Sequence, residues 1–423
     1  MSARRVLLVA YQCGPGMGSV SQIGWEWFAR LRQTHAVTLV TQVRNRAALT
    51  AAGVDTGGDA VLWIDSEWFA GPLYRLAKKM FPKSEHSVFL LSSLDYFVFD
   101  FLAWCRLRRA IAQGQRWDLL HRVTPVTLAA PTWLVRLPMP SVIGPLNSGL
   151  SDPPGFGQVM RQESTWLVQL RRLGRAWDEL TGCLRRASRI LVATRSTQQQ
   201  VPAAHQDRCR PMLENGVDLQ RFPAHPWPQP PASGQPLQLL FVGRLIPVKA
   251  LHLLLQAVAQ LCQVGADLRL TVVGDGPLRT DWQALCIQLG LDDVVSFTGA
   301  QPLDAVARHM AACHLLCLPS LRESGGAVVL EAMASARPVV AMNFGGPAEL
   351  VDDSVGRLLA LQSPEQVVRD LAAALADVVL HPEAWRERGQ EGRRRVEARY
   401  GWDAKVRAID ALYDDILLEG QPS

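Results

Sequence analysis

Two short segments in the second half of the sequence combine charges and glycines at spacings that suit binding of an anion. In the first segment, Arg244 and Lys249 are five residues apart, between an apolar run that ends near Gly243 and a helical pattern that begins near residue 250. Two cations at the end of a strand can hold a diphosphate group. An ordinary pair of surface cations is the alternative, and this segment alone does not separate the two interpretations.

The second segment places two glutamates around a glycine-rich start of a helix. Glu323 and Glu331 are separated by seven residues, and Gly325, Gly326 and Ala327 lie between them, where an apolar helical pattern starts. The N–H groups of a first helical turn can accept phosphate oxygens. Glu331 lies in an apolar helix and needs hydrogen-bond donors, which ribose hydroxyls would supply. The alternatives are a dipole-complementing Glu323 and a salt-bridged Glu331.

A glycine loop also follows the first apolar run of the sequence. Gly16 and Gly18 would let the backbone approach a donor phosphate or an acceptor closely. The spacing is Gly-x-Gly-x-Gly rather than that of a dinucleotide fingerprint, and the second expected strand ends at Gln42 with no acidic residue for a ribose. Binding of NAD is therefore not expected.

Strand and helix patterns alternate along the whole chain, which predicts parallel sheets with helices on both faces. The expected strands are residues 5–10, 37–41, 60–65, 119–123, 142–145, 190–193, 238–242, 268–273, 294–298, 315–318 and 338–341. The expected helices are residues 19–32, 162–187, 250–264, 278–289, 303–312, 327–335, 364–380, 382–399 and 402–418. The fold class is therefore α/β, with doubly wound, Rossmann-like sheets.

A proline-rich stretch divides the chain. Residues 223–236 are too rich in proline for a helix or a central strand, and we interpret them as a linker. Residues 1–222 are expected to form one Rossmann-like domain and residues 237–399 a second, followed by a last helix in 400–423. Ligands of such sheets bind at the carboxyl ends of the strands, so a cleft between two facing domains is the expected site.

Composition excludes several classes of protein. Of the 423 residues, 48% are hydrophobic, which excludes a mainly disordered chain. Apolar runs stay well below the ~20 residues of a spanning helix, which excludes a multi-pass membrane protein. The eight cysteines form no Cys-x-x-Cys pair, so neither a zinc cluster nor a disulfide framework is indicated. The short first apolar run is not typical of a signal peptide, and we expect a soluble cytoplasmic protein.

Charge is distributed unevenly between the halves. Residues 1–236 contain 27 Lys or Arg and 16 Asp or Glu, a net charge of +11, whereas residues 237–423 have a net charge of −6. Such asymmetry indicates that one half meets an anionic partner. The basic half has no zinc-finger or helix-turn-helix signature, so nucleic acid is not the expected partner.

Aromatic and basic residues alternate within residues 68–109, a pattern typical of segments that lie at a membrane surface. A buried helix with a solvated basic end is the alternative. The first interpretation predicts a lipid-linked acceptor or a peripheral contact with the inner face of the membrane.

In their order and combination, the motifs closely resemble those of glycosyltransferase family 4. The members of this family are retaining, nucleotide-sugar-dependent enzymes of GT-B fold. The motifs that carry the resemblance are Asn215-Gly216-Val217-Asp218 with Arg221-Phe222, the loop from Gly243 to Lys249, Val273-Gly274-Asp275-Gly276-Pro277-Leu278, Phe297-Thr298-Gly299 and the Glu-x7-Glu pair. One departure is Glu323-Ser324-Gly325-Gly326, where many members have Glu-Gly-Phe-Gly.

The resemblance implies roles for particular residues. Arg244 and Lys249 would hold the diphosphate, Glu323 would contact the donor sugar near the reacting carbon, and Glu331 would bind the ribose. Gly325 and Gly326 match positions that approach the phosphates. The first half resembles the family more loosely, and there His121 corresponds to a histidine on the acceptor side of the cleft. The alternative for His121 is a strand-end histidine that the backbone satisfies.

The resemblance therefore implies transfer of a hexose from a nucleotide diphosphate sugar to the hydroxyl of a glycan, lipid-linked or small-molecule acceptor, with retention of configuration. It also implies that the last helix crosses back to the first domain. Polysaccharide or glycoconjugate biosynthesis is the expected setting, and no metal cofactor is expected, since side chains supply the cations. The alternatives are a sugar-nucleotide epimerase or a phosphorylase on the same fold, and a silent subunit that binds the nucleotide sugar without catalysis.

Overall fold

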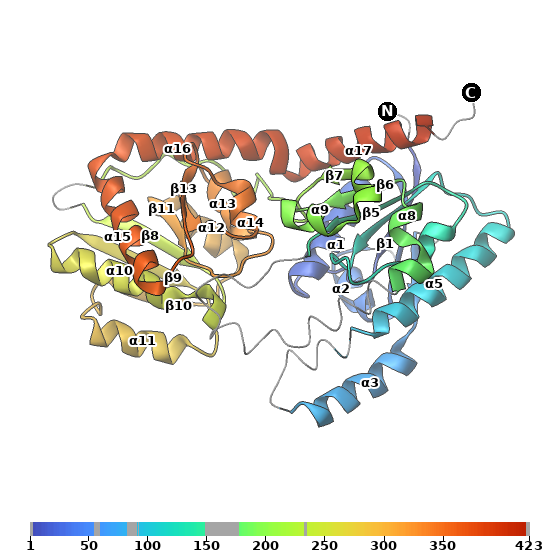
Figure 1. The fold of residues 1–423 in the computed structure, drawn as a ribbon, viewed down its shortest axis with the longest axis horizontal. Coiled ribbons are helices and arrows are strands. Elements are labelled where there is room, and N and C mark those ends of the chain that lie inside the picture. Colours follow the sequence, from blue (N-terminus) through green and yellow to red (C-terminus); the bar gives the residue numbers. More distant parts are fainter. Residues whose placement is uncertain are drawn as a thin grey trace. The chain divides into compact units, whose positions relative to one another are not determined.

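The structure is a computed structural model, and it describes residues 3–54, 60–82, 91, 93–148, 177–231 and 235–419. The chain divides into two compact units. Unit 1 comprises residues 1–149, 163–214 and 406–423, and unit 2 comprises residues 150–162 and 215–405. Each unit has its own parallel sheet (Figure 1).

Unit 1 contains a seven-stranded sheet in the order β3-β2-β1-β4-β5-β6-β7. All of its pairings are parallel. Its strands are β1 (Arg5–Ala10), β2 (Ala36–Gln42), β3 (Val61–Ile64), β4 (Leu119–Thr124), β5 (Ser141–Leu146), β6 (Arg189–Val192) and β7 (Cys209–Pro211). Its longer helices are α1 (Ser19–Leu31), α3 (Glu67–Met80) and α5 (Asp95–Ala112), and its shorter ones are α2 (Arg46–Ala51), α8 (Cys183–Arg186) and α9 (Arg195–Gln200).

The last helix, α17 (Trp402–Glu419), supplies unit 1 with a buried polar face from residue 406 onward. The Tyr413 hydroxyl lies 2.6 Å from Nδ1 of His121 on β4, and Asp410 lies 2.7 Å from Nε2 of His35. Arg4 donates to Asp414. Because these partners are buried or half-buried, the polar contacts fix this helix on the sheet of unit 1.

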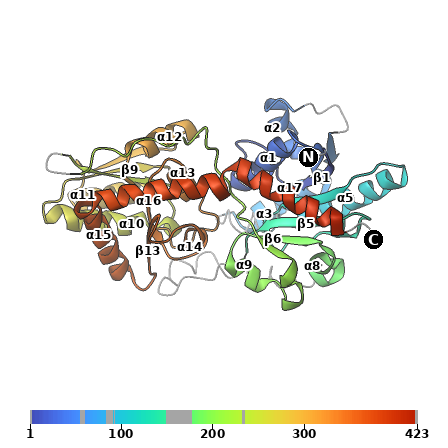
Figure 2. The same cartoon turned by 90° about the horizontal axis from the view of Figure 1, so that it is seen from above.

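Unit 2 contains a six-stranded parallel sheet in the order β10-β9-β8-β11-β12-β13. The strands are β8 (Leu237–Val242), β9 (Leu268–Val273), β10 (Val295–Gly299), β11 (Leu315–Leu318), β12 (Val339–Met342) and β13 (Gly356–Leu359). The helices are α10 (Leu251–Gln263), α11 (Arg279–Gln288), α12 (Leu303–Ala312), α13 (Ala327–Ala334), α14 (Gly346–Leu350), α15 (Pro364–Leu380) and α16 (Pro382–Arg395). Helices α10, α11 and α15 cover one face of the sheet, and α12 and α13 lie on the other (Figures 1 and 2).

The predicted fold of two doubly wound parallel sheets is confirmed. The predicted strands of both sheets are present because buried parallel strands read as continuous apolar runs. Two edge strands, β7 and β13, were not predicted, because β7 contains Arg210 and Pro211 and β13 begins with Gly356 and Arg357, so neither forms a continuous apolar run. Of the predicted helix at 162–187, residues 162–176 lie outside the described residues, and the described part is interrupted at Gly182, whose backbone is left-handed.

Two further predictions fall partly outside the description. Residues 232–234 of the predicted linker, and residues 83–90 and 92 of the aromatic and basic segment, are among those not described. Among the described residues, no helix is both long enough and apolar enough to cross a membrane.

Candidate active site

The carboxyl edge of the unit 2 sheet carries the candidate site. Strands β8 and β11 are neighbours in the middle of this sheet, and the chain leaves them toward opposite sides of it. Loops that follow two such strands diverge and leave a crevice, which is where open α/β sheets bind ligands. The predicted segments at 243–250 and 319–326 are these two loops.

Lys249 and Glu323 meet across this crevice. Lys249 ends the short 3-10 helix Pro247–Lys249, and its Nζ forms an ion pair with Oε2 of Glu323. Both side chains are only 17% exposed, so water screens the pair less than it would at a fully open surface. The stem of Lys249 passes over Gly243, at the end of β8. The structure therefore places a partly desolvated cation and carboxylate side by side between β8 and β11, at the switch point where the strand order of the sheet reverses direction.

The backbone holds the two loops together. The N–H of Leu321 donates to the carbonyl of Val248 at 2.8 Å, and the Leu321 side chain is fully buried. This hydrogen bond links the loop of Lys249 directly to the loop of Glu323. The residue after Lys249, Ala250, has a φ of 45°, a left-handed conformation that costs a non-glycine residue energy. Ala250 is fully buried, so the surrounding core holds this turn in place.

Glycines of two other motifs support the loops from outside. A Cβ atom at Gly274, after β9, would overlap the carbonyl oxygen of Gly243. A Cβ atom at Gly346, after β12, would lie 2.6 Å from the carbonyl oxygen of Ser324. The N–H of Gly346 donates to the carbonyl of Glu323 at 2.8 Å. Only glycine allows these close approaches, so these two motifs position the loops that bear Lys249 and Glu323.

The amino end of α13 lies next to Glu323 in the chain. Gly325 and Gly326 are buried, Ala327 is exposed, and Gly326 caps the helix with a left-handed backbone and no side chain. The first turn contains no acidic residue. Its partial positive charge therefore suits an anion.

Glu331 lies in the second turn of the same helix and is half-buried. Desolvation of its carboxylate raises its pKa to about 7, against the opposing field of Arg221. Arg221 itself forms a 3.2 Å ion pair with Asp304 on α12. Glu331 is thus close to half-ionised at neutral pH and suits a ligand that offers hydroxyl groups.

Arg244 has a different environment from Lys249. It lies on the same loop, its side chain is exposed, and that side chain forms no hydrogen bond or ion pair with another described residue. It is therefore a cation at the rim of the crevice, whereas Lys249 is held by Glu323. An open hollow of about 560 Å³ in unit 2, between α12 and residues 220–225, contains none of the predicted site residues among its lining.

In unit 1, Gly16 and Gly18 lie in the loop between β1 and α1, and both have positive φ, 74° and 105°. A Cβ atom at either would meet open space, so the backbone there is accessible. Strands β1 and β4 are the neighbours at the switch point of this sheet. The predicted glycine loop therefore follows a central strand at the carboxyl edge, as Lys249 does in unit 2.

His121 takes the alternative position that the sequence left open. It is fully buried within β4, with Nδ1 2.6 Å from the Tyr413 hydroxyl and Nε2 2.9 Å from the carbonyl of Gly144. Burial lowers its pKa to about 4. Both ring nitrogens are occupied within unit 1, so His121 is a core residue that helps to dock α17, and we leave it out of the candidate site.

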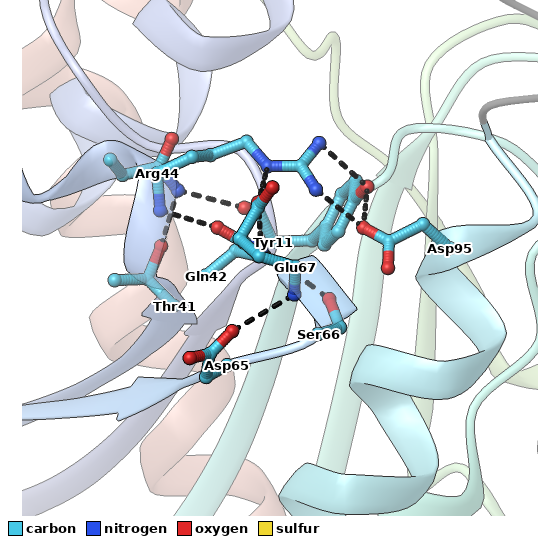
Figure 3. Close-up of polar contacts among 9 residues, drawn as sticks. Tyr11, Thr41, Gln42, Arg44, Asp65, Ser66, Glu67 and Asp95 are labelled. Carbon is cyan, nitrogen blue, oxygen red and sulfur yellow. Dashed lines mark hydrogen bonds and ion pairs between the residues drawn. The ribbon is translucent and has the colours of Figure 1, made fainter. Parts of the chain in front are cut away.

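Unit 1 also contains a polar group that the sequence did not reveal, at the carboxyl ends of β1, β2 and β3 (Figure 3). We call Tyr11, Arg44, Glu67 and Asp95 the Arg44 cluster. Arg44 donates to Asp95 at 2.6 Å and to Glu67 at 2.9 Å, and the Tyr11 hydroxyl donates to Asp95 at 2.9 Å. Its members are up to 84 residues apart in the sequence, so no local motif predicts that they meet.

Comparison with known proteins finds sequence relatives mainly for unit 2. Residues 227–392 match the family model of group 1 glycosyl transferases. D-inositol 3-phosphate glycosyltransferase from Saccharomonospora viridis is 37% identical over 212 residues, which are 47% of this chain and 48% of that protein. The 2-deoxystreptamine glucosyltransferase of Streptomyces kanamyceticus is 38% identical over 152 residues, 36% of this chain and 38% of that one. These matches span about half, or less, of the length of the curated relatives.

Solved structures resemble the whole chain at lower sequence identity. Sucrose-phosphate synthase from Thermosynechococcus elongatus has a TM-score of 0.61 at 19% identity, covering 99% of this chain and all of that one. HepE of Anabaena in complex with UDP-glucose has a TM-score of 0.61 at 17% identity, covering 97% of this chain and all of that one. The chain therefore has the GT-B fold, and its second unit is similar in sequence to the group 1 glycosyl transferases.

Proposed function

We propose that this protein is a retaining glycosyltransferase that moves a hexose from a nucleotide diphosphate sugar to a hydroxyl acceptor. The observation that carries the proposal is the contact of Lys249 with Glu323 on the two loops that flank the switch point of the unit 2 sheet. The similarity of residues 227–392 to group 1 glycosyl transferases supports it, as does the fold shared with a UDP-glucose complex.

The proposed chemistry is departure of the nucleotide diphosphate from the anomeric carbon of the sugar. Negative charge grows on the leaving oxygen, and groups already aimed at that charge lower the barrier. Lys249, Arg244 and the first turn of α13, at Gly325–Ala327, are assigned this task. In this proposal these groups stabilise the negative charge on the leaving oxygen, and no metal cofactor takes part.

The two glutamates are assigned to the other parts of the donor. Glu331 accepts hydrogen bonds from the ribose hydroxyls, and Glu323 contacts the sugar near its reacting carbon. In the unliganded protein Glu323 neutralises Lys249, so the arriving diphosphate competes with a carboxylate for the same ammonium group. Retention follows if the acceptor hydroxyl attacks from the face that the diphosphate leaves, with the leaving phosphate helping to remove its proton.

Unit 1 is assigned to the acceptor, a glycan, a lipid-linked sugar or a small molecule of glycoconjugate or polysaccharide synthesis. Gly16 and Gly18, which the sequence predicts to approach the donor phosphate or the acceptor, provide accessible backbone at the carboxyl edge of its sheet. Peripheral contact of the aromatic and basic segment at residues 68–109 with a membrane belongs to the same proposal.

The test is a transfer assay with the purified full chain. UDP-, GDP- and ADP-hexoses are offered with and without simple acceptor glycosides, and the anomeric configuration of the product is read by NMR. The proposal expects release of nucleotide diphosphate that an acceptor accelerates, and a product with the donor's configuration. A requirement for free inorganic phosphate, isomerisation of the sugar without an acceptor, or inversion would contradict it.

A further inference from the structure

Helix α3 in unit 1 buries very little of itself. Of its fourteen residues, only Ala70 and Ala77 are buried, and these are small side chains on the face toward the rest of the unit. A surface helix of a globular protein ordinarily turns a stripe of larger apolar side chains inward. In α3 no large apolar side chain is fully buried: Phe69 and Leu73 are half-buried, and the others are exposed.

Three large apolar residues of α3 form an exposed row. Trp68 is 66% exposed, Leu76 is 51% exposed and Met80 is 57% exposed. They are spaced by multiples of four residues, and exposed Pro72 fills the remaining step, so they lie along one side of the helix. Single exposed apolar residues are common, but an aligned row marks a surface that meets a partner.

Three cations lie beside this row. Arg75, Lys78 and Lys79 are exposed and lie within about one turn of each other. Lysine is scarce in this chain, with five in 423 residues, and two of the five are in this helix. The single acidic residue of α3, Glu67, is bound by Arg44. The outward face of α3 therefore combines apolar side chains with net positive charge.

The Arg44 cluster fixes this helix to unit 1 (Figure 3). Glu67 is the first residue of α3 and Asp95 is the first of α5, and Arg44 binds both carboxylates. Gln42 at the end of β2 donates to Glu67 at 2.5 Å. Because polar contacts hold its amino end, α3 does not need a large buried apolar face to stay in place.

Helix α5, the other part of the predicted membrane segment, uses its aromatic residues differently. Tyr96 and Phe99 are buried in the core. Trp104 packs against Trp133 at a ring distance of 6.0 Å and carries Arg108 over its face, and exposed Phe101 packs against the same tryptophan pair. The alternative interpretation, a packed helix with a solvated basic end, therefore describes α5 and not α3.

We propose that α3 lies in the interface of a membrane that contains anionic phospholipid. In that position Trp68, Leu76 and Met80 enter the boundary of the headgroups and acyl chains, and Arg75, Lys78 and Lys79 meet lipid phosphates. The inference narrows the proposed membrane contact to one helix. It does not depend on glycosyl transfer, because binding to vesicles is measured without donor or acceptor.

The experiment is co-sedimentation of the full chain with vesicles. One set is phosphatidylcholine with about 30% phosphatidylglycerol and the other is phosphatidylcholine alone, both at about 50 mM salt so that screening stays weak. We expect binding to the anionic vesicles. The triple variant Arg75→Glu, Lys78→Glu, Lys79→Glu should lower the partition coefficient roughly 100-fold, at about fivefold per basic residue even before the added repulsion.

A second variant and a matched control separate α3 from net charge. Trp68→Ser, Leu76→Ser, Met80→Ser should also lose binding, although its charge is unchanged. Arg386→Glu, Arg394→Glu, Arg399→Glu changes the net charge as the first variant does, but at exposed positions of unit 2, and should keep most of the binding. Unaltered circular dichroism and melting temperature show that each variant is folded.

Three results would overturn the inference. The first is that the wild-type chain stays in the supernatant with anionic vesicles. The second is that both α3 variants sediment with the vesicles as the wild type does. The third is that the unit 2 control loses as much binding as the charge variant of α3. A change of sedimentation coefficient in the α3 variants without loss of vesicle binding would likewise assign the row to a second copy of the chain rather than to lipid.

Discussion

At the scale of single residues, the contact between Lys249 and Glu323 sets the chemistry that the site can perform. In a partly desolvated crevice the pair of opposite charges is less costly than either ion alone. A diphosphate that binds Lys249 leaves Glu323 close to the sugar attached to that diphosphate. In the proposed mechanism, the ion pair between Lys249 and Glu323 is therefore the first contact that a bound donor breaks.

Removal of either partner should affect catalysis far more than folding. We expect Lys249→Ala and Glu323→Gln each to lower kcat by about 10²–10³-fold, the usual loss for a group aimed at transition-state charge. The measurement is initial-rate kinetics with the donor found in the transfer assay. Arg279→Ala, which breaks an exposed ion pair with Asp275 in the same unit, is the control and should leave kcat within about twofold. Turnover within tenfold of the wild type in both site variants would remove these residues from the mechanism.

Glu331 should make donor binding depend on pH. Its pKa is raised to about 7 by desolvation, and its ionised form is the better acceptor for two ribose hydroxyls. Between pH 6 and 8.5 the ionised fraction rises about tenfold, so the affinity for a nucleotide sugar should rise by a similar factor. Calorimetric titration across this range measures it, since a diphosphate diester does not itself titrate there. Glu331→Gln should give a flat profile, and a wild-type profile that is flat or falls with pH would show that Glu331 does not bind the ribose.

At the scale of elements, close backbone approaches determine how the loops of the site are held. Gly346 is the first residue of α14, and it lies against the loop that contains Ser324. Its backbone N–H donates a hydrogen bond to the carbonyl of Glu323. We expect Gly346→Ala to push this loop out of position and weaken donor binding by at least about tenfold. Gly71→Ala is the control, because a Cβ atom at Gly71 meets open space. Equal donor affinity in the two variants would show that the loop does not need this support.

The docking of α17 on unit 1 has its own test. Tyr413→Phe removes the hydroxyl that bonds Nδ1 of His121, and it leaves a buried ring nitrogen without that partner. The free energy of unfolding should fall by about 1–3 kcal/mol, measured by urea denaturation. Tyr74→Phe alters an exposed tyrosine of α3 and should change it by less than about 0.5 kcal/mol. If Tyr413→Phe is as neutral as its control, the hydrogen bond does not help to hold the helix.

The elements that could be predicted were those with local signals. The apolar runs of β8, β9 and β11 predicted buried parallel strands. The spacing of glycines and glutamates after β11 predicted the start of α13. Strand β13 begins with Gly356 and Arg357, so it has no continuous apolar run that would predict it. The position of His121 could not be predicted, because a histidine in an apolar strand reads the same whether it faces a cleft or a tyrosine from a helix nearly 300 residues away. The Arg44 cluster is long-range for the same reason.

At the scale of the whole molecule, the division of labour follows the two units. Unit 2 holds the residues assigned to the donor, and unit 1 holds the glycine loop assigned to the acceptor and the exposed face of α3. Net charge agrees with this division, because the basic residues 1–236 include the face proposed to meet anionic lipid. The proposed membrane contact would therefore use the basic half of the chain, whereas the proposed diphosphate site lies in the acidic half.

The central claim is that the carboxyl edge of the unit 2 sheet binds a nucleotide diphosphate through Lys249. Thermal denaturation of the wild type and Lys249→Ala with UDP, GDP and ADP tests it most directly, since a ligand of the folded state raises the melting temperature. At about 100 times its dissociation constant, one of these nucleotides should stabilise the wild type by about 2.7 kcal/mol and raise its melting temperature by several degrees, while Lys249→Ala shifts much less at the same concentration. No shift with any of the three nucleotides, or equal shifts in wild type and variant, would contradict the account.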